Sequence, residues 1–580
     1  MNRLFFYLKN SMTSNRRKPE KEFAEILSNP SSSGKRRVKR AINQLEFGDY
    51  YRGTVKIIRK VKPGPIILTI FDGTGTIEAV AHTRIFQNRE IESTKGTTTY
   101  SFGNLQIKDS RTKSKAISYS SDTSYSPESE NCPLAEEEVV EDAIVNIFGK
   151  ATFHRDQLEL EIKSIRSSSM DFEGILQQRS KPRRTEFSIP SQRYQAMKKR
   201  FIKIAQRIRR AIMDQQPILI RHHNDADGIC AGLAVEQAIL HEMERNNIDP
   251  KNKIYRSPSV SPFYDQIDLF RDVSKFNRYT NHFGDKSPLI LLLDTGSTPE
   301  NLFALQVLKS FKYECIVVDH HNPGNLEDGK SVICNYLEDH LNPYLFGYDS
   351  QTSGGMLGYE LARFIDEDFE APLYPAVAGV GDRCEGEEID KCIEKSGKNR
   401  EELMNMAKVI DYLAFHFRFE DGEGVYEQVF TNDKMVNLVA REVDRYFEET
   451  LNRILPHVQI EDFSAVKFVS LNLEQFTQRG KYPPPGKTLG LIHDYIAGQS
   501  DLKPVFTMGF FGDGIIIRAT EAILPVPELL VDLQKKFPLA AVEGGGHEQA
   551  GSIKFLELYG EQILREIKAR LENISFTDNK

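Results

Sequence analysis

The stretch "PILIRHHNDADGICAG", residues 217–232, decides the fold of this chain. Its apolar run, Pro217–Ile220, leads directly into two histidines, an asparagine and two aspartates, and an apolar helical pattern follows over Ile229–Glu244. An apolar run without alternation predicts a strand that is covered on both faces, as in a parallel sheet. So many polar groups at the tip of a buried strand are costly unless they pair or bind an ion.

Two more runs of this kind follow, "PLILLLD" (288–294) and "CIVVD" (315–319), with a predicted helix, Pro299–Phe311, between them. Strands that alternate with helices predict a doubly wound α/β domain over residues 214–415. The first run ends at His223, Asp225 and Asp227, the second at Asp294, and the third at Asp319, His320 and His321. A fourth apolar stretch, "AVAGVG", ends at Asp382. Because ligands bind beyond the carboxyl ends of parallel strands, we expect the first three sets of side chains to converge there, and the fourth to join them.

Converging carboxylates repel one another and lose their hydration, and divalent cations relieve both costs. Carboxylates combined with imidazoles suit two Mn²⁺ or Mg²⁺ ions, and histidine favours Mn²⁺. Two such ions about 3.5–4 Å apart would activate a water and stabilise the leaving oxygen of a phosphodiester. Any one of these aspartates alone is more often a helix cap or turn residue. The prediction of a metal site therefore depends on all four motifs together.

The N-terminal part of the chain predicts a small barrel. Residues 1–46 are basic and predict a disordered arm, for which a solvated tail without a partner is the alternative. Residues 47–168 predict an OB-fold-like barrel, or an unrelated β-barrel, with a disordered insertion at about 108–136. Candidate residues for stacking on bases are Tyr50, Tyr51, Phe71 and Phe153. Five strands are expected, at Tyr51–Val61, Ile66–Asp72, Thr76–Ala81, Asp142–Ala151 and Gln157–Ile165.

The remaining segments are assigned by their composition and periodicity. Residues 169–213 predict a basic linker and a basic amphipathic helix, Gln192–Met213. Residues 416–459 predict a helical connector, and residues 460–580 an α+β domain. Strands are expected in this last domain at Ala465–Leu471, Pro504–Phe511 and Gly514–Ala519, and helices at Pro527–Lys536 and Gly560–Asn573.

The bulk composition sets few limits on function. A net charge of −7 gives no global sign of nucleic-acid binding and leaves local basic surfaces open. The six cysteines form no CxxC pair, so neither a zinc ribbon nor a disulfide framework is expected. The first residues lack the apolar length of a signal peptide, and no stretch is long enough to span a membrane. We therefore expect a cytoplasmic protein that does not bind membranes.

The order H-x-D-x-D-G, D-T-G, D-H-H and G-D resembles the DHH phosphoesterase superfamily. Two C-terminal motifs, "GIIIRAT" (514–520) and "VEGGGHEQAGSIKF" (542–555), resemble the DHH-associated domain of that superfamily. The resemblance covers residues 215–575, and with the OB-like barrel it is closest to the archaeal RecJ-like single-strand exonucleases. It implies a DHH domain of doubly wound parallel-sheet type, a DHH-associated α+β domain and an N-terminal OB-like β-barrel.

The resemblance also implies roles for individual residues. His321 would face the scissile phosphate, and Asp319 would support a histidine or contact metal. Bacterial RecJ-type enzymes have an acid at the position of His223, and His222 is the rival ligand; His223 is preferred because it lies two residues before Asp225 on an extended segment. One metal would bind His223, Asp225 and Asp294, and the other Asp227, Asp294, His320 and Asp382. Substrate would contact Arg518, Gly544, Gly545, Gly546 and His547.

These implications together predict a two-metal-ion phosphodiesterase that acts as an exonuclease on single-stranded DNA or RNA, in repair or replication. Its binding should weaken with salt, because the barrel and basic linker would contact phosphates. A helicase or another replication or repair protein is left open as a partner. Three alternatives remain: a phosphodiesterase of cyclic dinucleotides or short oligonucleotides, a replisome scaffold without catalysis, and a pyrophosphatase.

Overall fold

The computed structural model describes residues 38–61, 65–86, 134–154, 157–259, 263–283, 286–478, 480–499 and 503–574. The predicted arm up to residue 37 and the predicted insertion up to residue 133 lie outside these ranges. The chain divides into two compact units, one that ends at Met170 and one that comprises most of the rest. Within the described ranges, no helix combines the length and apolarity needed to cross a bilayer.

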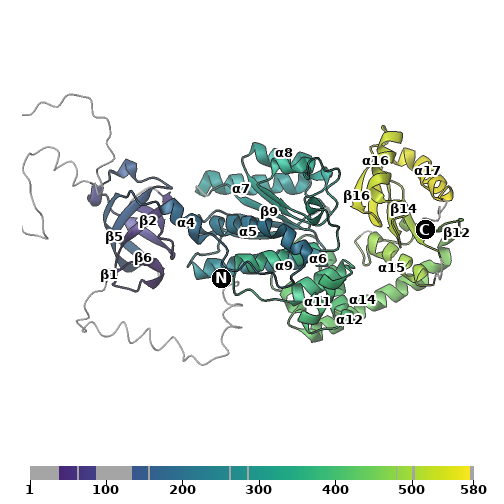
Figure 1. Ribbon diagram of the computed structural model, residues 1–580, viewed down its shortest axis with the longest axis horizontal. Helices are drawn as coiled ribbons and strands as arrows, with labels where there is room; N and C mark the ends of the chain where they lie inside the picture. Colours follow the sequence, from purple (N-terminus) through teal and green to yellow (C-terminus); the bar gives the residue numbers. More distant parts are fainter. Residues whose placement is uncertain are drawn as a thin grey trace, which may run out of the picture. The chain divides into compact units, whose positions relative to one another are not determined.

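The first unit is a closed barrel (Figure 1). Strand β2 pairs with both β3 and β5, and β4 pairs with β6 in parallel, which closes the sheet in the strand order of an OB-fold. The observed strands begin and end within three residues of the predicted ones: β2 Tyr50–Val61, β3 Ile66–Phe71, β4 Thr76–Ala81, β5 Ile144–His154 and β6 Gln157–Ser167. Residues 38–46 also belong to this unit, since β1 (Val38–Lys39) pairs with β2, and Ile42 and Leu45 are buried in the barrel core.

Two of the four predicted stacking residues are wrong. Tyr51 and Phe71 are fully buried inside the barrel, so neither can stack on a base. Successive side chains of a strand point to opposite faces, and Tyr50 and Tyr51 therefore cannot both face outward. Phe153 is half exposed and stacks on Phe47, and Tyr50 stacks on Phe148. Among the described residues of the barrel, these two pairs bring aromatic rings together on its surface.

The second unit contains a five-stranded parallel sheet in the order β11-β10-β9-β7-β8. Its strands are β7 Ile218–His222, β8 Ile254–Pro258, β9 Leu289–Leu293, β10 Glu314–Val318 and β11 Asp339–Leu341. Three of them coincide with the apolar runs of the sequence, and residues 289–293 are buried throughout. The doubly wound α/β architecture is confirmed.

Helices cover both faces of this sheet (Figure 1). One face packs against α5 (Gln192–Met213), α6 (Ala226–Arg245), α9 (Gly354–Ile365) and α10 (Leu373–Gly381), and the other against α7 (Gln266–Phe283) and α8 (Leu302–Ser310). The chain changes face between β7 and β9, because α6 lies on one side and α7 and α8 on the other. In doubly wound folds, this switch point is where ligands bind.

The basic linker is packed onto the α/β domain. It includes α4 (Phe172–Arg179), and its Phe187 and Ile189 belong to the core beside α5. Arg183 pairs with Glu367 and Arg184 with Glu370. These arginines are thus already neutralised by acids of their own chain, which weakens the expectation that the linker binds phosphates.

Helices α11 Glu387–Ser396 and α12 Arg400–Phe417 pack into the core of the α/β domain. The predicted connector, residues 416–459, contains α13 Tyr426–Val429 and α14 Asp433–Ile454. The C-terminal α+β domain has a mixed sheet in the order β12-β13-β14-β15-β17-β16. Helices α16 and α17 pack on one face of it, and α15 and the end of α14 on the other. The elements of this domain are β12 Gln459–Asp462, β13 Lys467–Asn472, α15 Pro485–Ala497, β14 Val505–Phe511, β15 Gly514–Ala519, α16 Val526–Lys536, β16 Glu543–His547, β17 Ala550–Lys554 and α17 Gly560–Glu572.

Glu360 on α9 makes the stability of the α/β domain depend on pH. Burial raises its pKa from 4.5 to about 7, and hydrogen bonds from the amides of Ser188 and Ile189 oppose this only partly. A raised carboxyl pKa gives stability that is complete below pH 4.5 and lost as the pH rises through 7. Between pH 4.5 and 7, the free energy of unfolding of the wild type should therefore fall by about 3 kcal/mol relative to that of Glu360→Gln. Calorimetric melting of both proteins at several pH values measures the difference, and Glu561→Gln on exposed α17 should show no such dependence.

Candidate metal centre

Asp294 lies at the centre of a cluster of acids and histidines at the switch point of the sheet. It follows β9 directly, it is buried, and its backbone is in the left-handed region with φ of 55°. Among the described residues, three of the four groups of side chains that could together bind a metal ion include Asp294. This position suits a residue that bridges two ions.

The first group joins the loop after β7 to Asp294. His223 Nδ1 lies 2.9 Å from Asp225 Oδ2 and 3.6 Å from Asp294 Oδ2. Asp225 is also the N-cap of α6, where its carboxylate accepts a hydrogen bond from the amide of Gly228. Burial acts to lower the pKa of His223, but the two carboxylates raise it well above its ordinary value. The group consists of the three residues predicted for the first metal.

The second group comprises Asp227, Asp294 and His320, with Asp382 beside it. His320 Nε2 lies 3.3 Å from Asp294 Oδ1, and 3.7 Å from both Asp227 Oδ2 and Asp382 Oδ2. The other ring nitrogen, Nδ1, lies 2.9 Å from the carbonyl oxygen of Ser350. A hydrogen bond donated by Nδ1 to this carbonyl would leave the Nε2 lone pair directed at the acids, as in a metal-ligating histidine.

The helix that begins at Gly354 orients Asp227. The two carboxylate oxygens of Asp227 accept hydrogen bonds from the backbone amides of Gly354, at 2.7 Å, and Gly355, at 2.9 Å. These are the first amides of α9, where the helix dipole favours a negative charge. Even so, burial and then the charge of Asp294 raise the pKa of Asp227 well above its ordinary range.

Asp319 orients the ring of His321 by a hydrogen bond. Its Oδ1 lies 2.7 Å from His321 Nδ1 and accepts the amide of His320, while its Oδ2 accepts the amide of Ser297. Burial acts to raise the pKa of Asp319, but His321 lowers it, so this carboxylate is ionised. Asn342 donates to the carbonyl oxygen of His321 and fixes the backbone there. Both carboxylate oxygens of Asp319 are thus engaged by the protein, which favours the supporting role over direct metal contact.

The donor set fits divalent cations. Asp294 Oδ1 is buried and lacks an aligned hydrogen-bond donor, although a buried carboxylate oxygen normally has one. Burial and then the neighbouring acids raise the pKa of Asp382 to about 6, as expected where several carboxylates share one site. A cation between these oxygens and His320 Nε2 would remove the repulsion and supply the missing partner.

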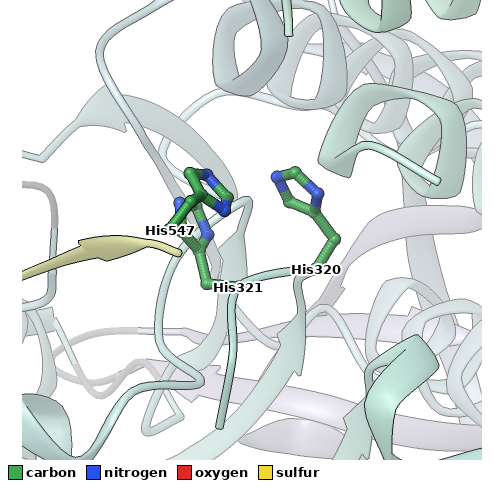
Figure 2. Close-up of side chains that lie close together, drawn as sticks. All are labelled: His320, His321 and His547. Atoms are coloured by element: carbon green, nitrogen blue, oxygen red, sulfur yellow. The ribbon is translucent and has the colours of Figure 1, made fainter. Parts of the chain in front are cut away.

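The C-terminal domain contributes His547 to the same place (Figure 2). This histidine ends β16, and its ring stacks on His321 at 4.7 Å between centroids and lies 5.4 Å from the ring of His320. Burial and then the charges of His321 and His320 lower the pKa of His547 well below its ordinary value. A neutral imidazole at this position can accept or donate a hydrogen bond to a ligand that enters the cluster.

The glycines before His547 have a structural role of their own. Gly544 and Gly546 lie in the β16–β17 hairpin, and a Cβ at either would stand 2.2 Å from a carbonyl oxygen of β17. At Gly545 nothing lies within 4 Å. Because β16 is the edge strand of the sheet, some of its amides face away from β17. Arg518, on β15, lies beside α15, where its Nε would be 3.9 Å from a Cβ at Gly490.

The structure separates the two candidate histidines and gives the element that ends at Asp382. His222 is fully buried, with Nδ1 2.7 Å from the carbonyl oxygen of His223 and Nε2 near Arg256, so His223 is the histidine among the acids. The fourth apolar stretch, to which the sequence assigned no element, forms α10 over residues 373–381, and its C-cap is Asp382, beside His320. A short buried helix and a buried strand have the same apolar composition, and only the structure separates them.

Several residues that shape the site had weak signals in the sequence or none. Gly354 and Gly355 belong to "TSGG", and Asn342 to "NP", two short stretches that carry no metal ligands themselves. Asp411, on α12, accepts a hydrogen bond from the amide of Ala226 at the start of α6 and pairs with Lys487. Nothing in the sequence around Asp411 distinguishes it from a surface acid.

The fold and the site define a class: doubly wound α/β proteins in which carboxylates and histidines from several strand ends form one metal-ligand cluster. Residues 217–380 match the model of the N-terminal domain of the DHH family. A solved DHH domain, from a protein described as a member of a family of ribosomal proteins, is 33% identical with a TM-score of 0.67, covering 70% of this chain and 97% of that one. The chain therefore belongs to the DHH family, a family of metal-dependent phosphoesterases.

Two further relatives extend the comparison. An uncharacterized protein of Methanocaldococcus jannaschii is 31% identical over 475 residues, which are 74% of this chain and 62% of that protein. The chain thus spans less than two thirds of that relative. The structure of RecJ from Thermus thermophilus in complex with Mn²⁺ is 16% identical with a TM-score of 0.41, covering 64% of this chain and 53% of that one.

Proposed function

We propose that this protein is a two-metal-ion phosphodiesterase that removes nucleotides from the end of single-stranded DNA or RNA. The observation that carries the proposal is the position of Asp294, whose two oxygens face two separate groups of ligands. One ion would bind His223, Asp225 and Asp294, and the other Asp227, Asp294, His320 and Asp382. Bound there, two divalent ions supply the charge that activates a water and stabilises the leaving oxygen in an in-line displacement.

The side chains around this cluster would orient the substrate. His321 has its Nδ1 on Asp319, so its Nε2 is available to a phosphate oxygen or to the leaving group. His547, stacked on His321, would contact the same phosphate from the C-terminal domain. Because the two histidines come from different domains, a substrate that reaches both must lie between these domains. This arrangement supports action on a strand end that enters the space between them.

The barrel supports single-stranded nucleic acid as the substrate class. Its surface carries the stacked pairs Phe47–Phe153 and Tyr50–Phe148, and Arg52 lies over the ring of Phe148. Aromatic rings beside a guanidinium are the groups on which OB-folds stack bases. A phosphodiesterase for cyclic dinucleotides or short oligonucleotides would gain nothing from this surface.

The test incubates end-labelled single-stranded DNA and RNA with the full chain and Mn²⁺, with EDTA and Asp294→Ala as controls. We expect a ladder of shortened strands that depends on Mn²⁺ and is absent with the variant. Comparison of strands labelled at the 5′ end with strands labelled at the 3′ end gives the polarity of cleavage. Comparison of DNA with RNA gives the sugar preference. Cleavage of a dinucleotide but of no longer strand would favour the small-substrate alternative, and no cleavage of any strand would favour a scaffold.

Asp411 is expected to tune metal affinity although it is not a ligand. Its hydrogen bond to the amide of Ala226, at 2.9 Å, fixes the start of α6, between Asp225 and Asp227. Removing such a supporting partner typically costs about 10- to 100-fold in metal affinity. Asp411→Leu should therefore weaken Mn²⁺ binding by about 10-fold in calorimetric titration. Lys487→Met removes only the ion pair of Asp411 and should leave the affinity near that of the wild type.

A further inference from the structure

Arg383 follows Asp382 directly and has a backbone conformation that arginine rarely adopts. Its φ is 57°, and it occupies the position after the C-cap of α10, where the amide of Cys384 bonds back to the carbonyl of Gly379. Glycine is the usual residue in this left-handed position, and another residue costs about 1 kcal/mol there. An arginine at this strained position, beside a predicted metal ligand, calls for a functional reason.

The guanidinium of Arg383 is bound by a carboxylate of the C-terminal domain. Its Nη1 and Nη2 donate to Asp494 Oδ1 and Oδ2 on α15 at 3.0 and 2.6 Å. This two-pronged geometry is also the one in which arginine binds a phosphate. Both side chains are exposed, 66% for Arg383 and 48% for Asp494, so the pair is open to solvent and contributes little stability.

A second arginine lies at the same place. Asp494 and Gly490 are four residues apart on α15 and therefore share a face, and Arg518 lies over Gly490. Burial and then the charge of Arg383 lower the pKa of Arg518. Within the described ranges, no carboxylate forms an ion pair with Arg518, whose hydrogen-bond partner is the carbonyl oxygen of Ile517. Two guanidinium groups thus share one carboxylate.

We propose that Arg383 and Arg518 form a second phosphate-binding site next to the metal cluster, and that Asp494 occupies it as an internal substitute for phosphate. The ligand is a phosphate group of the substrate strand that neighbours the scissile one. When this phosphate enters, Arg383 releases Asp494 and binds the phosphate instead. The phosphate then neutralises the excess positive charge of the two arginines. The inference rests on the proposed function for the identity of the strand, and on the arginine–carboxylate geometry for the site itself.

The test measures binding of short oligothymidylate and oligouridylate to the full chain by calorimetric titration, with Ca²⁺ in place of Mn²⁺. Arg383→Ala should raise the Kd about 10-fold, because a charge-assisted contact to phosphate is lost. Asp494→Asn should lower the Kd about 3-fold, because the competing carboxylate is removed. Arg565→Ala, which breaks an even more exposed arginine–carboxylate pair with Glu561 on α17, is the control and should change nothing.

A strand series with one neutral methylphosphonate linkage at a time locates the phosphate. In the wild type, one linkage beside the cleaved end should cost about 10-fold in Kd, and in Arg383→Ala the same linkage should cost less, because Arg518 alone remains to bind it. If Asp494→Asn weakens binding as Arg383→Ala does, the pair only holds the domains together and the proposal is overturned. An unchanged Kd for Arg383→Ala also overturns it.

The two proposals fail in distinguishable ways. If binding of strands depends on Arg383 but no strand is cleaved with Mn²⁺, the exonuclease proposal is overturned and the phosphate-site proposal stands. If wild type, Arg383→Ala and Asp494→Asn cleave strands with the same KM, the exonuclease proposal stands and the phosphate-site proposal is overturned. Failure of the wild type to bind either strand overturns both.

Discussion

Asp294→Ala is expected to lower kcat on single strands by at least about 10³-fold, the largest effect of any single substitution in this chain. Removing it takes one oxygen from each of the two proposed ion sites, since Oδ2 faces His223 and Oδ1 faces His320. A loss of this size corresponds to about 4 kcal/mol of transition-state stabilisation, within the range attributed to metal ions. Single-turnover cleavage with saturating Mn²⁺ measures it.

Two measurements separate loss of metal from loss of fold. Calorimetric titration should show that Asp294→Ala binds Mn²⁺ at least about 10²-fold more weakly, because a bridging ligand is missing from both sites. Its circular dichroism spectrum without metal should match that of the wild type, while its melting temperature should fall, because His223 and His320 lose a carboxylate that raises the pKa of both. Asp532→Ala, an exposed acid paired with Arg570, serves as the control for both. Wild-type activity in Asp294→Ala would contradict the bridging role.

The strand ends could be located from the sequence because two physical signals coincide there. An unbroken apolar run such as Leu289–Leu293 must be buried on both faces, and a polar residue directly after it marks the edge of the sheet. Parallel strands end at a common edge, so the apolar runs alone were enough to predict that Asp225, Asp294 and His320 would meet. The roles of the individual residues do not follow from the apolar runs and come from the family resemblance.

The failures have an equally physical origin. The sequence places Tyr51 and Phe71 in strands, but the face that each side chain occupies depends on the register, and a shift of one residue reverses it. Asp382 lies 3.7 Å from His320 at the end of α10, an element that its apolar stretch alone does not distinguish from a strand. Asp411 acts through a tertiary contact 185 residues away in sequence, so no local pattern could indicate it.

Gly354→Ala is the second substitution with a large expected effect, and it adds only one methyl group. A Cβ at this position would stand 2.4 Å from Asp294 Cβ and 2.7 Å from its Oδ1, while the Gly354 amide donates to Asp227. Either Asp294 moves, or the start of α9 retreats from Asp227. Both displace a proposed metal ligand by a fraction of an ångström to an ångström, and misplacement of this order costs about 10²-fold in rate.

Alanine is a better helix former than glycine, so the change should not destabilise α9 through propensity, and any effect must come from the steric contact with Asp294. We expect kcat to fall about 10²-fold and Mn²⁺ affinity to fall with it, while the circular dichroism spectrum is unchanged. Gly486→Ala is the matched control, because Gly486 lies in the first turn of α15 with nothing within 4 Å of the added methyl. Full activity in Gly354→Ala would mean that Asp294 can be displaced without loss of function, and would contradict its role as a ligand shared by two ions.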